Sequence, residues 1–378
     1  MLISSVRYYG EDFRFHYGDI RVEDGFFAEI NARGCEAPDD CDVVVPGLVD
    51  IHLHGNSGVD LSDGGYDGLV IIARHLALSG TTSFSATSLT LPETALQAAY
   101  KNAAWLKREA PAGCASLRGI TMEGPFFSEE KKGAHEARYL RRPDISTLER
   151  LQNAADGLIR IACVAPELPG AAEYIRAVVA MGIACAAAHT NAHYDEAAAG
   201  FDAGVSHLTH LFNAMPPLLH REPGVIGAAA ERPGVTAELI GDGIHVHPSA
   251  VRAAFKLFGA ERICLISDAI PAAGLPEGGV STLGGQRVTV RAGRATLEDG
   301  TIAGSVATLL DCVRRVIGMG IPAEKALRCA TAVPACVLGA YDIGVIATGK
   351  RADFLVMDTA WNIRSVYISG QRIQRHKS

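Results

Sequence analysis

The chain lacks the features of membrane-spanning and nucleic-acid-binding proteins. None of its apolar runs approaches the roughly 18 residues that a helix needs to cross a bilayer, and it has no long basic run. Its 35 Lys and Arg residues are outnumbered by 42 Asp and Glu residues, which gives a formal net charge of −7. We therefore expect neither a nucleic acid nor an anionic membrane among its partners.

The cysteine pattern argues against two further classes of protein. The nine Cys residues are scattered, odd in number and without a CxxC motif, so they predict neither a disulfide framework nor a structural zinc site. The first residues also lack the charged and apolar regions of a signal peptide, and we expect a cytoplasmic protein. With 48% hydrophobic residues in 378, the chain can build a large core in one or two domains.

Both ends of the chain predict short β-strands. The N-terminal candidates are 2–8, 13–17, 20–23 and 26–30, with a turn expected at Gly18. The C-terminal candidates are 354–357, 363–368 and 371–374. Neither set alone is large enough to bury one face of a sheet. We therefore expect residues 1–46 and 347–378 to form one small composite β domain, with residues 47–346 inserted between them.

The middle of the chain alternates short apolar runs with helical patterns. The runs are 48–54, 82–86, 119–123, 159–165, 183–189, 205–210, 237–242 and 263–268. Helical patterns between them include 66–78, 171–181, 195–203 and 248–258. Eight strands alternating with helices predict an α/β protein built as a (β/α)8 barrel. A doubly wound open sheet is the alternative, but no GxGxxG motif follows an early strand.

Several of the eight runs end in residues that can bind a metal or transfer a proton. These are His52, His54, Glu123, His189, His210 and Asp268. An HxH pair alone is weak evidence, because about 0.4 such pairs are expected by chance among 13 His residues. The carboxyl ends of barrel strands converge on one face, however, so the whole set predicts a site for a divalent ion.

Asp268 suggests what such a site does. It could serve only as a helix cap or turn carboxylate. Beside a metal-activated water it could instead act as a general base and then return the proton to a leaving amine. The second role predicts hydrolysis of a C–N bond, typically an amide. His207 has the opposite strand parity to His210, and we expect it to pack outside the barrel.

Longer motifs resemble a known family. The segment PGLVDIHLHG at 46–55 resembles the first-strand signature of the amidohydrolase superfamily. The segment MEGPFFSEEKKGAH at 122–135 and the block containing THLFNAM and REPG, within 188–229, resemble N-acetylglucosamine-6-phosphate deacetylases. DGIHV at 242–246, ISDAIPAAG at 266–274 and GTIAGS at 300–305 follow in the same order. By these motifs the chain is identified as a member of that deacetylase family.

The resemblance implies a fold and an activity. The fold is a (β/α)8 barrel with a small β-sandwich domain, and the activity is removal of acetate from N-acetylglucosamine 6-phosphate. The resemblance also implies a divalent metal cofactor, zinc or iron, held by Glu123, His189 and His210. Asp268 matches the catalytic aspartate.

The resemblance further implies a substrate site. His135, next to Ala134, matches a residue that contacts the substrate and polarises the acetyl carbonyl. The sugar-contacting and pocket-lining matches are Asn213, Ala214, Ile302, Ala303 and Gly304. Arg221 and His245 match the groups that bind the 6-phosphate, and both can donate charge-assisted hydrogen bonds. A homodimer is expected, with Arg221 reaching the partner's site.

Several alternatives stay open at this point. The GAH turn continues with Glu136-Ala137 rather than the Asn-Pro frequent in the family, and nothing excludes N-acetylgalactosamine 6-phosphate as the substrate. Another amidohydrolase, such as a dihydroorotase or an N-acyl-amino-acid deacylase, is a weaker alternative. A non-catalytic sugar-phosphate-binding protein is another. His52 and His54 could hold a second ion with Glu123 as a bridge, or could only hydrogen-bond around one; we favour two ions.

Overall fold

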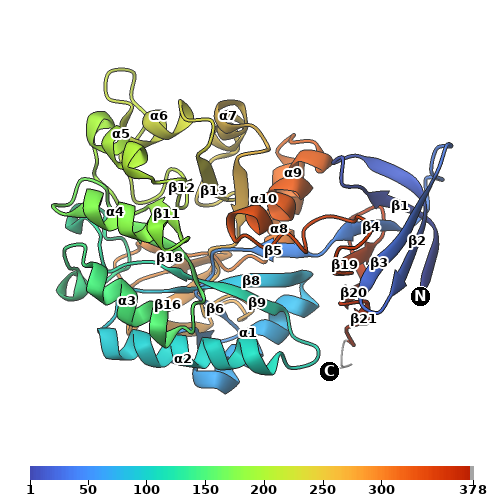
Figure 1. Ribbon diagram of the computed structural model, residues 1–378, viewed down its shortest axis with the longest axis horizontal. Helices are drawn as coiled ribbons and strands as arrows, with labels where there is room; N and C mark the ends of the chain where they lie inside the picture. The colour runs from blue at the N-terminus through green and yellow to red at the C-terminus, as the bar shows by residue number, and fades with distance from the viewer. Residues whose placement is uncertain (375–378) are drawn as a thin grey trace.

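The computed structural model describes residues 1–374, and its largest sheet is a parallel barrel (Figure 1). In spatial order its strands are β5 (Leu48–Asp50), β8 (Thr81–Ser88), β9 (Ser116–Met122), β10 (Ile159–Val164), β11 (Ala184–Ala187), β12 (His207–Leu208), β13 (Thr236–Ile240) and β14 (Ile263–Ile266). A parallel bridge between Leu53 and Ala269 joins the first strand to the last. The His54 amide donates to the Ala269 carbonyl at 2.7 Å, and the Asp268 amide donates to the His52 carbonyl at 3.0 Å.

Helices cover the outside of this barrel. They are α1 (Gly65–Leu78), α2 (Glu93–Glu109), α3 (Ile145–Ala154), α4 (Ala171–Ala180), α5 (Tyr194–Ala203), α6 (Gly224–Ala230), α7 (Pro248–Phe258), α8 (Leu309–Gly318), α9 (Ala323–Ala330) and α10 (Ala332–Val337). In α1, Leu69, Ile72, Ala73 and Leu76 are buried, which is the helical spacing of a face packed on a sheet. No helix in residues 1–374 is both long and apolar enough to span a bilayer.

The barrel has two apolar layers because strand side chains alternate between its faces. Val49, Ile161, Ala186 and Ile266 belong to an inner cluster, whereas neighbours such as Leu48 and Leu265 pack in the larger outer cluster. Each of the eight apolar runs overlaps a barrel strand, and the four helical patterns match α1, α4, α5 and α7. The predicted (β/α)8 architecture is confirmed.

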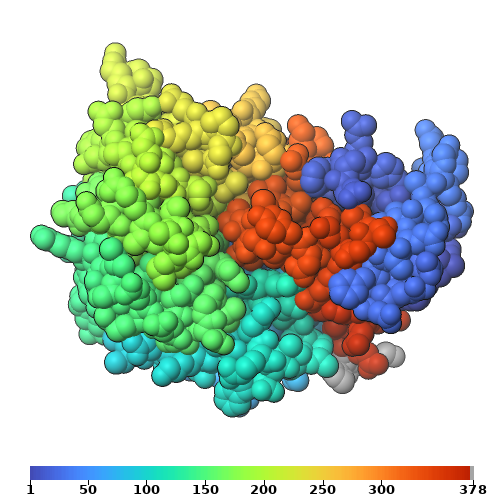
Figure 2. Space-filling model, viewed as in Figure 1, coloured from blue at the N-terminus to red at the C-terminus, as the bar shows by residue number. Residues whose placement is uncertain are grey.

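The two ends of the chain share one seven-stranded sheet. Its order is β21 (Gln371–Arg372), β20 (Ile363–Ile368), β19 (Phe354–Met357), β4 (Val43–Pro46), β1 (Leu2–Tyr9), β2 (Phe15–Glu23) and β3 (Phe26–Arg33). The sheet folds over so that β3 meets the segment just before β19, where the Phe27 amide donates to the Lys350 carbonyl at 2.9 Å. The rings of Phe27 and Phe354 lie 5.8 Å apart in the enclosed core. Figure 2 shows the blue and red ends of the chain together on one side of the molecule. The exact division at 46 and 347 stays a prediction.

One expected turn in this sheet was wrong. Gly18 lies inside the continuous strand β2 and pairs with Val6 on one side and Ala32 on the other. A Cβ atom at this position would lie 2.0 Å from the Asn31 carbonyl oxygen. Gly18 therefore allows close backbone approach between strands rather than a reversal of the chain.

A second antiparallel sheet was not predicted. It is inserted between β14 and α8 and consists of β15 (Val280–Leu283), β16 (Gln286–Arg291), β17 (Arg294–Thr296) and β18 (Ile302–Gly304). Its inner side chains form a separate core with Leu89 and Ile270. The Gly284-Gly285 pair that joins β15 to β16 is a hairpin signal that sequence reading could have used. A two-stranded hairpin, β6 (Gly55–Asn56) and β7 (Val59–Asp60), and the short 3-10 helices η1 (Glu129–Lys131) and η2 (Ala137–Tyr139) complete the fold.

The close approach at Gly18 leads to a stability prediction. Gly18→Ala should lower the melting temperature, because the new methyl group forces β2 and β3 apart at a cost of roughly 1–3 kcal/mol. Gly34→Ala is the matched control, since a Cβ at Gly34 meets nothing within 4 Å. Equal melting temperatures for the two variants would contradict the steric argument.

Candidate active site

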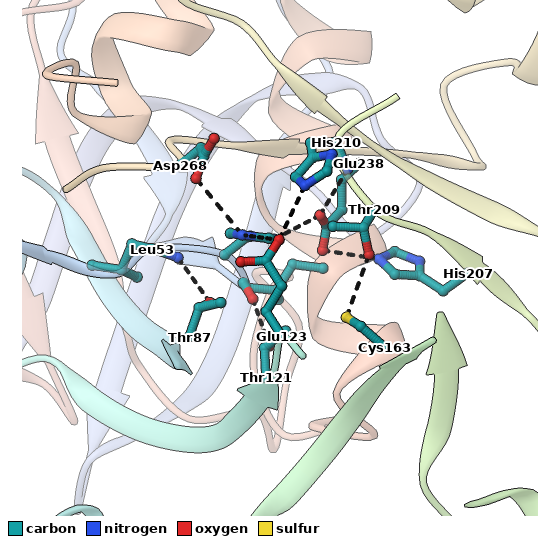
Figure 3. Close-up of polar contacts among 12 residues, drawn as sticks. Leu53, Thr87, Thr121, Glu123, Cys163, His207, Thr209, His210, Glu238 and Asp268 are labelled. Atoms are coloured by element: carbon teal, nitrogen blue, oxygen red, sulfur yellow. Dashed lines mark hydrogen bonds and ion pairs between the residues drawn. The ribbon is translucent and has the colours of Figure 1, made fainter. Parts of the chain in front are cut away.

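Three buried side chains converge at the carboxyl ends of three barrel strands. Glu123 follows β9, His189 lies two residues after β11 and His210 lies two residues after β12. The Oε1 atom of Glu123 lies 3.2 Å from His189 Nε2 and 3.0 Å from His210 Nε2. The two Nε2 atoms are 3.1 Å apart. Glu123, His210 and Asp268 can be seen pointing toward one another in Figure 3.

The hydrogen bonds of these two imidazoles indicate which ring nitrogen carries the proton. His189 Nδ1 lies 2.8 Å from the Lys131 carbonyl oxygen, and His210 Nδ1 lies 3.2 Å from the Asn213 carbonyl oxygen. A carbonyl only accepts, so each Nδ1 donates and each Nε2 has a lone pair. Two lone pairs and a carboxylate oxygen thus meet without a proton between them. Ligand atoms about 2.0–2.1 Å from a tetrahedral ion would be roughly 3.3 Å apart, so this group fits a divalent cation.

A second group lies on the other side of Glu123. The Oδ1 atom of Asp268 is 3.7 Å from His52 Nε2 and 3.5 Å from His54 Nε2. Glu123 faces both groups, because its Oε2 atom is 3.3 Å from His54 Nε2 while its Oε1 atom belongs to the first group. Among the described residues, His52 Nε2 and His54 Nδ1 have no hydrogen-bond partner. His52, His54 and Asp268 thus form a second possible metal-binding group.

Backbone strain turns three of these side chains toward the site. His189, His210 and Asp268 have φ angles of 44°, 29° and 48°, a region that costs non-glycine residues roughly 1–3 kcal/mol each. Two backbone hydrogen bonds hold Asp268 in this conformation. Its amide donates to the His52 carbonyl, and its carbonyl accepts from the Ser305 amide.

The positive φ angle at His210 explains why the expected position of His207, outside the barrel, was wrong. His207 Nε2 lies 3.1 Å from the Oε1 atom of Glu238, which is fully buried on β13. Thr209 meets Cys163 of the inner cluster, so the alternation holds up to Thr209. It fails at His210, where the positive φ redirects the chain.

The charges within the site are coupled. Burial opposes ionisation of Glu123, but the nearby His52 outweighs it and holds the pKa of Glu123 well below the usual range. Burial also opposes a charge on His52, and the Glu238 and Glu123 carboxylates outweigh it and raise its pKa. For Asp268, the hydrogen bond with His54 outweighs burial and lowers the pKa. Both carboxylates are therefore ionised near neutral pH.

His135 is uncharged, unlike the ionised carboxylates of Glu123 and Asp268. Burial, reinforced by the neighbouring His189, holds its pKa well below the usual range, so the ring is neutral. The Thr90 amide donates to His135 Nδ1 at 3.1 Å. The ring proton must then lie on Nε2, which is 3.6 Å from Glu123 Oε2. His135 thus presents a neutral N–H donor at the metal-binding groups.

These groups open onto one cavity of about 340 Å³, a size suited to a small ligand. The predicted residues that line it are His54, Glu123, Ala134, His135, His189, Asn213, Ala214, His210, His245, Asp268, Ile302, Ala303 and Gly304. His245 donates from Nδ1 to Asp242 at 2.7 Å. Burial opposes the charge on His245, but that hydrogen bond raises its pKa. Arg221 is exposed on the loop before α6 and does not line this cavity.

Sequence reasoning missed three contributors to this site. Lys131 supplies the carbonyl that orients His189, and Thr90 supplies the amide that orients His135. Backbone groups of this kind leave no signal in residue identity. Glu238 did leave one, because it is a charged residue between the apolar Ala237 and Leu239 of a predicted barrel strand.

The comparisons with known proteins agree with this geometry. The sequence model of the amidohydrolase family matches residues 43–373. An N-acetylglucosamine-6-phosphate deacetylase from Bacillus subtilis is 36% identical over 95% of this chain and 93% of its own length. The chain belongs to this deacetylase family of amidohydrolases. The family assignment from sequence motifs is confirmed.

Two other members of the deacetylase family bear on the substrate. An N-acetylgalactosamine-6-phosphate deacetylase from Escherichia coli O157:H7 is 34% identical over 93% of this chain and 93% of its own length. A solved structure from Mycobacterium smegmatis holds a mutant N-acetyl-D-glucosamine-6-phosphate deacetylase in complex with N-acetyl-D-glucosamine 6-phosphate. It superposes with a TM-score of 0.92 at 32% identity, covering 99% of each chain.

A divalent ion should stabilise this deacetylase-family protein. Without a cation, the Glu123 carboxylate and the lone pairs of His189 and His210 face one another in a buried site. Adding zinc to chelator-treated protein should therefore raise the melting temperature, by an amount equivalent to about 2.7 kcal/mol at 100 times the dissociation constant. Glu123→Gln should lose most of this rise, whereas Thr209→Val should retain it. A zinc effect of equal size in all three proteins would contradict the assignment of the first group.

Proposed function

We propose that this protein hydrolyses the N-acetyl group of N-acetylglucosamine 6-phosphate, giving glucosamine 6-phosphate and acetate. The observation that carries the proposal is the shared cavity in which a possible metal-binding group, an ionised aspartate and a neutral imidazole N–H face one another. Amide hydrolysis needs an activated water, a proton acceptor and a donor for the carbonyl oxygen. The family membership supports the same reaction.

Each of these side chains has a defined task in the proposed reaction. A divalent ion held by Glu123, His189 and His210 would supply a Lewis acid that activates water and polarises the acetyl carbonyl. Asp268 accepts a proton from the attacking water, and it returns that proton to the amine as the C–N bond breaks. His135 donates its Nε2 hydrogen to the carbonyl oxygen, whose negative charge increases in the transition state.

The phosphate requires positive charge at the far end of the substrate. His245, held by Asp242, lies on the cavity wall and provides one such group. Arg221 lies outside its own chain's cavity, on a loop that projects from the barrel between β12 and α6 (Figures 1 and 2). Leu218 and Leu219 on this loop are 42% and 53% exposed. We therefore propose a homodimer in which the loop packs on the partner and Arg221 completes the partner's phosphate site.

We further propose two ions per chain, zinc or iron. His52, His54 and Asp268 would hold the second ion, and Glu123 would bridge because its two oxygens face the two groups. A cytoplasmic location is also proposed, since all nine Cys residues are free thiols and free thiols are typical of reducing compartments.

The galacto epimer is the second candidate substrate, because the Escherichia coli relative named for it is nearly as similar as the Bacillus subtilis one. The test is acetate release from both epimers, each with and without the 6-phosphate, and with and without a chelator. We expect fastest turnover with the phosphorylated gluco epimer. Faster turnover of the phosphorylated galacto epimer would reverse the substrate assignment, and no acetate release from either would favour a binding protein.

Asp268→Asn should reduce turnover by at least about 100-fold, because the amide has nearly the same shape but cannot accept the proton of the water. Acetate release is measured at saturating substrate, and bound metal is measured in parallel. If turnover persists with the metal content intact, Asp268 is not the general base.

Arg221→Ala should raise KM for the phosphorylated sugar far more than for the unphosphorylated one. Mixing Arg221→Ala with Asp268→Asn tests whether the site is shared. A mixed dimer would combine the intact Asp268 of one chain with the intact Arg221 of the other, and activity should return. No recovery, in a mixture shown to exchange subunits, would contradict a shared phosphate site.

A further inference from the structure

A buried carboxylate beneath the site has no task in the reaction proposed above. Glu238 lies on β13 with its side chain inside the barrel and is fully buried. Its Oε2 atom accepts from His52 Nδ1 at 2.8 Å and from the His210 amide at 3.1 Å. Its Oε1 atom accepts from His207 Nε2 at 3.1 Å. Figure 3 shows Glu238 between His210 and His207. One carboxylate thus contacts a member of each possible metal-binding group.

The contact with Glu238 fixes the proton of His52. A carboxylate can only accept a hydrogen bond, so His52 donates from Nδ1, and in the neutral ring that binds a metal the lone pair is on Nε2. That Nε2 atom is buried, has no hydrogen-bond partner among the described residues, and lies 3.5 Å from Glu123 Oε1 and 3.7 Å from Asp268 Oδ1. His54 differs, because its Nδ1 atom has no hydrogen-bond partner among residues 1–374.

Glu238 is itself held in place from the opposite side. His207 donates to it from Nε2, and its Nδ1 atom lies 2.6 Å from the Thr236 hydroxyl, which is also 3.4 Å from the Ser206 carbonyl oxygen. Thr236, His207, Glu238 and His52 therefore form a continuous line of hydrogen bonds. Such a fully satisfied network restricts the rotation of each member.

The ligand imidazoles also differ in the charge behind them. His189 and His210 are oriented by neutral backbone carbonyls, whereas His52 is oriented by a carboxylate. A carboxylate behind an imidazole makes its other nitrogen a better metal ligand, and loss of such a partner typically weakens metal binding by 10- to 100-fold.

We propose that Glu238 is a positioning residue that orients His52, fixes its proton on Nδ1 and thereby sets the affinity for a second divalent ion. This inference rests on the proposed two-ion site, whereas the deacetylase assignment does not depend on it. The affinity for the first ion should depend little on the charge of Glu238, because Glu238 contacts His210 through the backbone amide and not through the imidazole ring.

Glu238→Gln tests the role of the charge. The glutamine carbonyl oxygen can still accept from His52 and from the His210 amide, and its NH₂ group can donate to His207 after a change of tautomer. Zinc and cobalt are titrated into metal-free protein, and bound metal is measured after equilibrium dialysis. We expect two binding steps in the native protein. In Glu238→Gln, the second step should weaken by about 10- to 100-fold and the first by less than about threefold.

Thr209→Val is the matched control. Thr209 is also fully buried, and its hydroxyl hydrogen-bonds with Cys163, so both binding steps should keep their native affinity. Unchanged steps in Glu238→Gln would overturn the proposal, and so would equal weakening of both. A single step in the native protein would also overturn it, while acetate release by that same protein would separately preserve the deacetylase assignment.

A metal-free measurement covers the case in which Glu238→Gln does not fold. Nitrogen-15 chemical shifts distinguish the protonated from the unprotonated ring nitrogen of a neutral histidine. In native metal-free protein, the His52 signals, assigned by their loss in His52→Gln, should show a proton on Nδ1. A proton on Nε2 alone would overturn the proposal, because Glu238 would then not fix the ring.

Discussion

The closure of the barrel between its first and last strands is the constraint on which the site depends. The pairing is short and irregular. It consists of the backbone hydrogen bonds that link His52 and His54 to Asp268 and Ala269. Asp50 reinforces it by accepting from the amides of both His52 and Ser267 at 3.3 Å. Without this seam, the HxH pair and Asp268 would lie at opposite edges of an open sheet, and the second metal-binding group would not exist.

The small β domain contributes to the same seam. Its strand β4 continues through Gly47 into β5, and β19 from the other end of the chain pairs with β4. The chain is closely packed at Gly47, between β4 and β5, since a Cβ at this position would lie 2.1 Å from Thr82 Oγ1. The terminal sheet therefore holds the strand that carries His52 and His54, although it contributes no residue to the cavity.

Sequence reasoning succeeded where a residue's position follows from its place on a strand. The barrel strands followed from the repeated apolar runs, and Glu123, His189, His210 and Asp268 followed from their positions at strand ends. It failed where the outcome depends on a contact with another strand or on a local break in the strand geometry. Gly18 resembled a turn because its closeness to Asn31 is a tertiary contact. Glu238 was overlooked because its meaning depends on His52, which is 186 residues away, and His207 was misplaced because the turn at His210 breaks the alternation.

The sheet formed by β15 to β18 separates recognition from chemistry. It is built almost entirely from pairings between consecutive strands and has its own small core. It supplies Leu283, Ile302, Ala303 and Gly304 to the cavity wall but none of the side chains that transfer protons or face a metal. One side-chain bond, from Gln286 to the Ala134 carbonyl at 2.7 Å, ties it to the turn that carries His135. A different hairpin of the same span would therefore reshape the pocket for another acylated sugar, provided that it keeps the contacts with Ala134 and Asp268 that hold the hydrolytic groups in place.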